Sequence, residues 1–453
     1  MYSSIKLLAL VLLSSQFAQA QLVPAPSLPP APAFLHTAPA LSAPLACVHP
    51  PMAPPAPHAP LPPLPPNPET DVYPAPAPEM PLVPADADLE MAPAPKPPHG
   101  HGFNQQIQEP ASEKNPGIEK TRKISKNIKI SKDDKLQIDN KYGKVHVNTN
   151  GSKSEIIVDI TIIARGETEA EAQQILDKIK IQETKEGNLI ALKTILEQVN
   201  SKNSTVTNST NKGFEINYMV TMPKTTAVAL KNSFGDMYLG ELNAPADLQV
   251  SYGNLKTERL NGASNNVKIK FGNGNLLYAK QCSLDVSYSN VRLDGIEKLD
   301  LQSKFSDLTL PLIEDMIIKS KYDKLKIGKV NSMQGSTGYS DCRVDNLQNT
   351  MDMKVQYCNN FEVKNASKNF KSISLEGGYS TFNLNFDDNT NFNFNVDLHY
   401  GNLKADKDLV NFKMIEKDHA SNEYQGQYGK SNPKSNVNIK AKYGDVKFVQ
   451  VGN

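Results

Sequence analysis

The stretch Val250-Ser251-Tyr252-Gly253-Asn254-Leu255 decides the fold, because its pattern recurs along the chain as far as residue 345. In each copy an aromatic residue precedes a small residue and then, in most copies, Asn or Asp. The aromatic residues at 252, 271, 288, 305, 322 and 339 are separated by 19, 17, 17, 17 and 17 residues. A fixed short period is typical of a solenoid, whose units are stable only against their neighbours. The sequence therefore indicates an architecture and says little about activity.

Apolar residues flank the aromatic residue at alternating positions, as Val250 and Leu255 do. Alternation on both sides of a short interruption predicts two strands joined by a corner. Gly, Ser, Asn and Asp suit that corner because they tolerate left-handed backbone conformations. We expect the aromatic side chains to stack in the core and the Asn and Asp residues to form a corner column. The predicted core and corner residues are Phe234, Asp236, Tyr252, Asn254, Phe271, Asn273, Tyr288, Asn290, Phe305, Asp307, Tyr322, Tyr339, Asp341, Tyr357 and Asn359.

A second apolar pair follows eight and eleven residues after the aromatic position, as Ile313 and Met316 do after Phe305. This pair predicts a further side of each coil. Each coil then has two or three strands, which pair in parallel with those of the neighbouring coils. Later copies are expected at Tyr357, Tyr379, Tyr400, Tyr428 and Tyr443, where the spacing becomes irregular. The predicted fold class is all-β: a parallel β-solenoid with coils of about 17–19 residues.

Four parts are predicted along the chain. Residues 1–20 have the apolar run and small-residue cleavage site of a secretory signal peptide. Residues 21–116 form a disordered proline-rich segment and linker, since 27 of the 33 prolines lie between 21 and 100 and favour polyproline II. Residues 117–223 form a cap of strands, one helix and a hairpin, and residues 224–453 form the solenoid. No later apolar run is long enough to span a bilayer, so we expect an exported protein that is periplasmic, cell-surface or secreted.

The predicted cap contains the one helix that the sequence indicates, from Glu167 to about Ile179. Thr168 can cap its start, and Glu171 stands three residues later, as in a capping box. Short strands around 179–181 and 189–192 flank Glu186-Gly187-Asn188 and predict a hairpin.

Composition excludes several functional classes. The 49 Lys and Arg residues nearly balance the 48 Asp and Glu residues, so no overall field favours nucleic acid. Cys47, Cys282, Cys342 and Cys358 are too sparse for a disulfide framework. Cys342 and Cys358 fall on adjacent coils but two residues out of phase, which favours buried thiols over a disulfide. His99 and His101 lack further metal ligands and are better explained as linker.

The residues from Leu136 onward, with Tyr218-Met219-Val220-Thr221-Met222-Pro223-Lys224 and Asn232-Ser233-Phe234-Gly235-Asp236, resemble a family of bacterial exported β-helix proteins. These proteins are known as "putative adhesins" and largely lack a defined function. The resemblance covers about residues 123–451, and the long proline-rich segment departs from the family pattern. It implies a place in the cell envelope and adhesion, and it carries over no catalytic or ligand-binding residue.

Three functions follow from these observations. The first is a non-catalytic structural or adhesin-like binding rod on a proline-rich spacer, with a glycan or an envelope or matrix protein as partner. The second is a β-helix enzyme that acts on polysaccharide, for which Asp307, Asp323 and Asp341 are the recurring carboxylates. The third is a calcium-binding solenoid, although Lys324 and Thr381 interrupt the acidic corners. We expect the first, with no catalytic residue, no metal and no cofactor.

Overall fold

The computed structural model describes residues 117–152, 154–197 and 213–451. The predicted signal peptide (residues 1–20) and the whole predicted proline-rich segment and linker (residues 21–116), with Cys47, His99 and His101, lie outside these ranges. The described residues contain 27 strands and one helix, which confirms the all-β class. No helix among them is long and apolar enough to cross a membrane.

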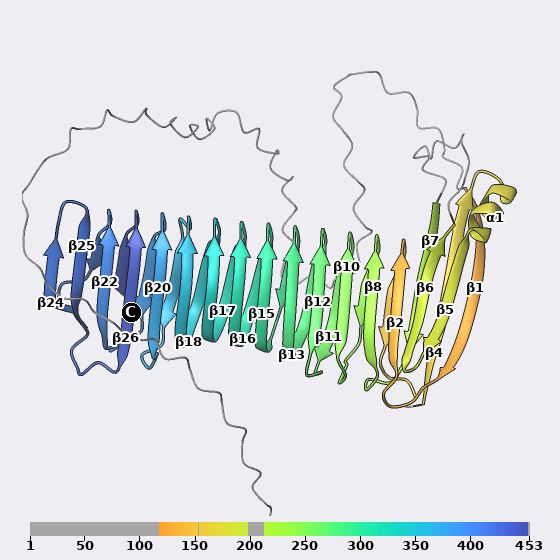
Figure 1. Cartoon of the computed structure of the whole chain (residues 1–453), viewed down its shortest axis with the longest axis horizontal. Helices are drawn as coiled ribbons and strands as arrows, with labels where there is room; N and C mark the ends of the chain where they lie inside the picture. The colour runs from red at the N-terminus through yellow and green to blue at the C-terminus, as the bar shows by residue number, and fades with distance from the viewer. Residues whose placement is uncertain (1–116, 153, 198–212, 452–453) are drawn as a thin grey trace, which may run out of the picture. The chain divides into compact units, whose positions relative to one another are not determined.

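The N-terminal part of the described chain combines an antiparallel sheet, a helix and a hairpin (Figure 1). Strand β4 pairs antiparallel with both β1 and β7, and β5 pairs antiparallel with β6 as the predicted hairpin. The elements are β1 (Ile118–Lys129), β2 (Lys135–Lys141), β3 (Val145–Asn148), β4 (Glu155–Gly166), α1 (Glu169–Asp177), β5 (Ile179–Glu186), β6 (Leu189–Leu196) and β7 (Gly213–Thr221).

Helix α1 begins as the sequence predicts. The Thr168 side chain accepts a hydrogen bond from the Glu171 backbone N–H, and the Glu171 carboxylate accepts one from the Glu167 backbone N–H. Ala172 and Leu176 are buried on the face of the helix that packs toward β1 and β4.

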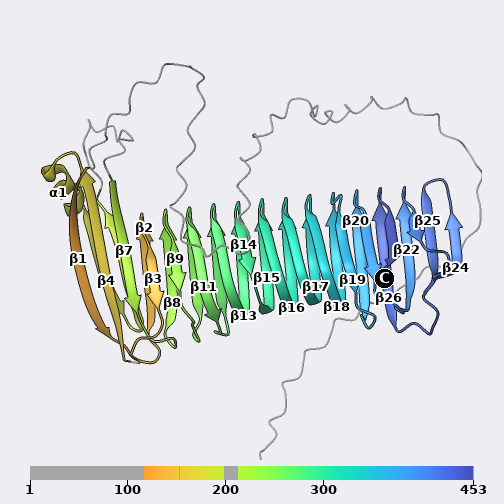
Figure 2. The ribbon, with the colours of Figure 1, turned by 180° about the vertical axis from the view of Figure 1, so that it is seen from behind.

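Two ladders of parallel strands follow, and their members lie side by side in Figures 1 and 2. We call the strands that precede each aromatic residue the first ladder, and those that follow it the second ladder. The strands involved are β8 (Ala227–Ser233), β9 (Met237–Leu239), β10 (Ala246–Ser251), β11 (Asn254–Leu260), β12 (Asn265–Lys270), β13 (Asn273–Ser287), β14 (Asn290–Leu293), β15 (Ile296–Lys304), β16 (Asp307–Lys321), β17 (Lys324–Gly338) and β18 (Asp341–Gln356).

The register of the ladders reproduces the sequence period. Leu301 pairs with Ile318, and Asp307 pairs with Lys324, so equivalent residues of successive repeats are neighbours. A register shift between Val330 and Ser332 absorbs the extra residue before Tyr357. Strands β13, β16, β17 and β18 run through both ladders without a break, whereas the sequence predicts separate short strands. The apolar pair Ile313 and Met316 is buried, as predicted.

The ladders begin inside the section predicted to be a separate cap. Strand β2 pairs in parallel with β8, and β3 pairs in parallel with β9, so both belong to the first repeat of the ladders. The antiparallel sheet joins the second ladder where β7 pairs in parallel with β3.

The order of strands changes near the C-terminus. The later copies of the repeat, where the sequence spacing is irregular, do not follow one another in sequence order, because β26 inserts between β20 and β22 and pairs in parallel with both. Strand β25 then pairs antiparallel with β22 and with β24, which closes the first ladder. The strands are β19 (Phe361–Ala366), β20 (Ser372–Gly378), β21 (Phe382–Phe386), β22 (Phe392–His399), β23 (Leu403–Ala405), β24 (Val410–Lys417), β25 (Ser421–Tyr428), β26 (Ser435–Lys442) and β27 (Val446–Gln450).

Three cysteines of the described part are buried free thiols: Cys282, Cys342 and Cys358. Burial raises the pKa of all three, that of Cys282 to about 12. Since the thiolate is the reactive form, these thiols should not react with a thiol reagent at pH 8 while the protein is folded. Titration of a Cys47→Ser variant with a chromogenic disulfide reagent, before and after unfolding, checks this. Rapid reaction of any of these three thiols in the folded protein would contradict their burial.

Candidate functional site

The aromatic residues of the repeat lie on the surface, which corrects the prediction that they stack in the core. Twelve of them have exposed fractions between 39% and 59% and left-handed φ angles between 51° and 60°. If the alternation of the preceding strand continued through the aromatic residue, its side chain would point inward. The positive φ of the aromatic residue turns the side chain outward instead. We call these residues the aromatic column: Tyr142, Phe234, Tyr252, Phe271, Tyr288, Phe305, Tyr322, Tyr339, Tyr357, Tyr379, Tyr443 and Tyr400.

The rings of the aromatic column stack on one another without a gap. Neighbouring ring centroids are between 4.7 and 5.1 Å apart. The spatial order at the end is Tyr379, Tyr443, Tyr400, because β26 lies between β20 and β22. Tyr428 is absent from the column and is buried against Phe392. Since the ring faces cover one another, the column offers solvent mainly its ring edges.

Stacking helps to explain why aromatic residues tolerate this backbone conformation. A left-handed residue that is not glycine costs about 1–2 kcal/mol. An aromatic pair stabilises by about 0.5–1.5 kcal/mol beyond the burial of its area, and each inner ring makes two such pairs. The two effects are of similar size, so stacking along the column offsets the backbone cost.

A small residue follows each ring of the aromatic column, and where this residue is not glycine its side chain is turned inward. From Gly272 onward these residues form a hydrogen-bonded chain, in which the backbone N–H of one repeat donates to the side chain of the next. Ser289, Ser306, Asp323 and Ser340 are buried members. We call this chain the inner polar column: Gly272, Ser289, Ser306, Asp323, Ser340, Cys358 and Ser380.

Asp323 is the one carboxylate of the inner polar column. It accepts hydrogen bonds from the hydroxyls of Ser303 and Ser320 and from the backbone N–H groups of Ser306 and Lys321. Burial nevertheless raises the pKa of the Asp323 carboxyl above its ordinary value.

The predicted Asn and Asp corner column exists in most repeats. Asp236 accepts hydrogen bonds from the backbone and side chain of Asn254, whose side-chain oxygen accepts one from Asn273. Asn290, Asp307 and Asp341 continue the row in register, with Lys324 between the last two. The prediction of Asn359 is wrong by one residue, because the pairing of Cys342 with Phe361 places Asn360 opposite Asp341.

The two sides of the aromatic column differ in charge. The residue before each ring is Lys at 141, 270, 304, 321 and 442, and it is never acidic in the twelve repeats. The ammonium nitrogen of Lys321 lies 4.8 Å from the centroid of the Tyr322 ring and 5.4 Å from that of Tyr339. On the other side lies the Asn and Asp row. The column is therefore an apolar ridge with a basic flank and a polar flank.

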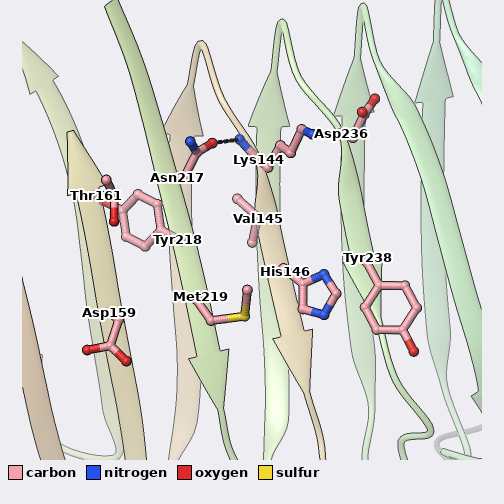
Figure 3. A pocket seen from close by; sticks show the side chains of 10 residues that line it. All are labelled: Lys144, Val145, His146, Asp159, Thr161, Asn217, Tyr218, Met219, Asp236 and Tyr238. Carbon is pink, nitrogen blue, oxygen red and sulfur yellow. Dashed lines mark hydrogen bonds between the residues drawn. The ribbon is translucent and has the colours of Figure 1, made fainter. Parts of the chain in front are cut away.

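A surface hollow of about 350 Å³ lies beside the first rings of the column (Figure 3). Side chains from β4, β7, β3 and β9 line it, with His146 stacked on Tyr238 at a centroid distance of 4.4 Å. Several polar groups are fixed by neighbours: the Asn217 side-chain oxygen accepts from the Lys144 backbone N–H at 2.8 Å, and the Tyr238 hydroxyl donates to Glu258 at 2.7 Å. The Glu258 carboxylate raises the pKa of Tyr238 to about 12.

The three carboxylates considered for polysaccharide chemistry do not lie together on one surface. Asp323 is buried inside the ladders, whereas Asp307 and Asp341 lie in the outer corner row. Within residues 117–152, 154–197 and 213–451, no group of three or more His, Cys, Asp or Glu side chains is placed to hold a metal ion.

The exposed aromatic column is the feature that the sequence interpretation missed. A signal was present, because every ring of the column is followed by Gly, Ser, Asp or Cys. Because only small residues occur after the ring, this following residue, and not the ring itself, is the one that points into the narrow interior between the ladders.

The fold and surface define an all-β protein of stacked parallel strands that carries a continuous exposed aromatic column. No family model and no curated protein matches the chain. Three similar solved structures are a "putative cell adhesion protein" from Clostridium sporogenes, a "putative adhesin" from Bacteroides fragilis and a "putative lipid binding protein" from Parabacteroides distasonis. They are 14%, 12% and 10% identical and cover 73%, 72% and 72% of this chain and 100%, 97% and 96% of their own. Their TM-scores are 0.19, 0.24 and 0.22. The first two names are of the kind that the sequence resemblance predicts. Because the TM-scores are low, the function proposed below is based on the surface of this chain and not on these structures.

Proposed function

We propose that the protein is an exported bacterial cell-envelope protein and acts as a non-catalytic binding rod. In this proposal the ladders form a β-solenoid and the aromatic column is its binding face. The signal-peptide pattern at residues 1–20 supports export. The one-repeat parallel register of both ladders supports the solenoid.

The observation that carries this proposal is the length and exposure of the aromatic column. A contiguous exposed apolar surface on a soluble protein marks an interaction site, and aromatic residues are enriched at interfaces. A linear ridge of ring edges fits an extended polymer better than a compact ligand. The proposed partner is therefore a glycan chain or an extended segment of an envelope or matrix protein.

The burial of Asp323 supports the non-catalytic role over the polysaccharide-cleaving alternative. Most enzymes that hydrolyse a glycosidic bond use two carboxyl groups that flank this bond in the substrate. Asp323 faces the interior, where four donors already occupy its oxygen atoms.

Binding of the full chain to arrays of glycans and matrix proteins tests the proposal. Replacing Phe271, Tyr288 and Phe305 with Asn should weaken any binding by roughly tenfold or more. Asn keeps the backbone conformation, because it tolerates left-handed φ. The matched control replaces three aliphatic residues of similar exposure, Leu277, Leu312 and Ile317, with Thr and should bind as the wild type does.

Three outcomes would contradict this function. Equal binding by the ring variant would remove the column as the binding face. Turnover of a polysaccharide that is lost on replacing Asp307 or Asp341 with Asn would establish the enzyme instead. A calcium-dependent rise in melting temperature would favour the third alternative.

A further inference from the structure

Three lysines on the outer face of the first ladder are neutralised by an acidic residue on a neighbouring strand. The two residues of each pair lie directly opposite one another in the parallel register, with N–O distances between 2.7 and 3.7 Å. The pairs are Lys231 with Asp139, Lys268 with Asp285, and Lys354 with Glu376. Opposite charges across a register stabilise a sheet and like charges destabilise it. These ion pairs therefore compensate part of the positive charge of this face.

Four other exposed lysines, on β15, β16 and β17 near the middle of the ladders, have no acidic residue opposite them (Figure 1). We call them the lysine cluster: Lys304, Lys319, Lys321 and Lys326. Lys304 and Lys321 lie directly opposite each other, and Lys326 lies opposite Arg343. Within residues 117–152, 154–197 and 213–451, no ion pair involves a member of this cluster.

Three carboxylates stand close to the lysine cluster in the sequence and do not neutralise it. Asp307 and Asp341 of the corner row lie on either side of Lys324, which is not a member of the cluster. Asp323 is buried, and four donors already occupy its oxygen atoms. The lysine cluster is therefore an uncompensated positive patch, and an anionic ligand would relieve the repulsion within it.

The lysine cluster lies on both sides of the aromatic column. Lys304 and Lys321 directly precede Phe305 and Tyr322, and the ammonium nitrogen of Lys321 is 4.8 Å from the centroid of the Tyr322 ring. Lys326 stands four residues after Tyr322, on the outer face of the second ladder. Positive charge therefore flanks the apolar ridge on both sides over the span of these two rings.

Such a surface fits a chain that carries both carboxylates and apolar C–H groups, as an acidic polysaccharide does. Lysine binds anionic groups as a point charge, and complementary charge selects among partners. A single-stranded nucleic acid is another extended polyanion, but its bases stack on the faces of aromatic side chains. Here neighbouring rings cover those faces, with the centroids of Phe305 and Tyr322 4.8 Å apart. The surface therefore favours the polysaccharide.

From this charge and geometry we propose that the lysine cluster binds the carboxylates of an acidic polysaccharide that lies along the aromatic column. The sugar rings contact the ring edges of the column, and the ammonium groups on both flanks hold the carboxylates. This inference rests on the proposed function, because it takes the aromatic column as the binding face and names the chemical class of its ligand.

Calorimetric titration of the full chain with polygalacturonate at 0.15 M salt tests this inference. At that ionic strength charges more than about 8 Å apart are largely screened, so the affinity reports local contacts. Replacing Lys304, Lys319 and Lys321 with Gln should weaken binding by roughly tenfold or more. Carboxyl-reduced polygalacturonate keeps the sugar chain without its charge. It should bind the wild type roughly tenfold more weakly than the acidic polymer does, and the lysine variant should bind it as the wild type does.

The matched control replaces the three ion-paired lysines, Lys231, Lys268 and Lys354, with Gln. It removes the same three positive charges from the same face and should change the Kd for polygalacturonate by less than about threefold. The urea midpoint of the lysine variant should equal or exceed that of the wild type, because the variant loses the repulsion between Lys304 and Lys321. An equal or higher midpoint separates a loss of binding from a loss of fold.

Equal weakening by the lysine variant and the control would overturn the proposal, because net charge alone would then attract the polymer. Absence of polygalacturonate binding, or equally tight binding of the carboxyl-reduced polymer, would exclude the carboxylate as the recognised group. Tighter binding of a single-stranded oligonucleotide, lost in the lysine variant, would identify a nucleic acid instead.

The proposed function fails by a different result. If the variant with Asn at Phe271, Tyr288 and Phe305 bound polygalacturonate as the wild type does, the aromatic column would not be the binding face. Column-dependent binding of a neutral glycan on the arrays, with no binding of polygalacturonate, would instead leave the proposed function standing and overturn the acidic ligand.

Discussion

Replacing Gly272 with Ala should destabilise the stacked strands by ~3 kcal/mol or more. An added Cβ would stand 1.9 Å from the carbonyl oxygen of Gly253 in the preceding repeat. Overpacking of a core usually costs about 1–3 kcal/mol, because flexible side chains move aside. Here the obstacle is backbone held between two paired ladders, so we expect a cost at or above the upper end of that range.

The midpoint of urea unfolding, followed by circular dichroism, measures this effect. Gly213 provides a matched control, because a Cβ added there meets no atom within 4 Å. Gly213→Ala should unfold within about 0.5 kcal/mol of the wild type. A urea midpoint of Gly272→Ala equal to that of this control would show that successive repeats do not approach each other so closely at Gly272.

The sequence predicted the strands and their period because hydrophobic alternation and spacing are local signals. Val250, Leu255, Ile313 and Met316 are buried as expected, and the helix begins at its predicted cap. The alternation failed only at the aromatic residue, where one left-handed residue reverses the direction of the side chain. Side-chain period alone carries no information about φ, so the candidate binding surface was assigned to the core.

The C-terminal order could not be predicted for a different physical reason. Strand β20 pairs with β26 across the residues of β21 to β25, although β22 has the same pattern and follows sooner. Both strands present alternating apolar residues and a Tyr-Gly corner, so either could pair with β20 on local grounds. The choice depends on the antiparallel strand β25, which covers the other edge of β22 and is itself paired with β24.

Replacing Asp323 with Ala should lower the free energy of unfolding by ~2–4 kcal/mol, whereas replacing it with Ser should cost less than ~1 kcal/mol. Alanine leaves the buried N–H of Ser306 and the N–H of Lys321 without their acceptor. Each buried donor left unpaired costs about 1–3 kcal/mol. Serine is the residue that the neighbouring repeats carry, at Ser306 and Ser340. There the hydroxyl accepts from the preceding repeat and donates to the carbonyl two residues earlier.

Measuring Asp323→Ser and wild type at several pH values separates the charge of Asp323 from its hydrogen bonds. The folded pKa of this carboxyl lies above its unfolded value, so its protonated form is favoured by folding. The stabilisation is fully present below the unfolded pKa, near 3.8, and is lost as pH rises through the folded pKa. The wild type should therefore gain stability relative to Asp323→Ser as the pH falls from 7 toward 4. A difference that is constant over this range, or that changes in the opposite direction, would mean that the four donors outweigh burial and that the inner polar column favours a charged carboxylate.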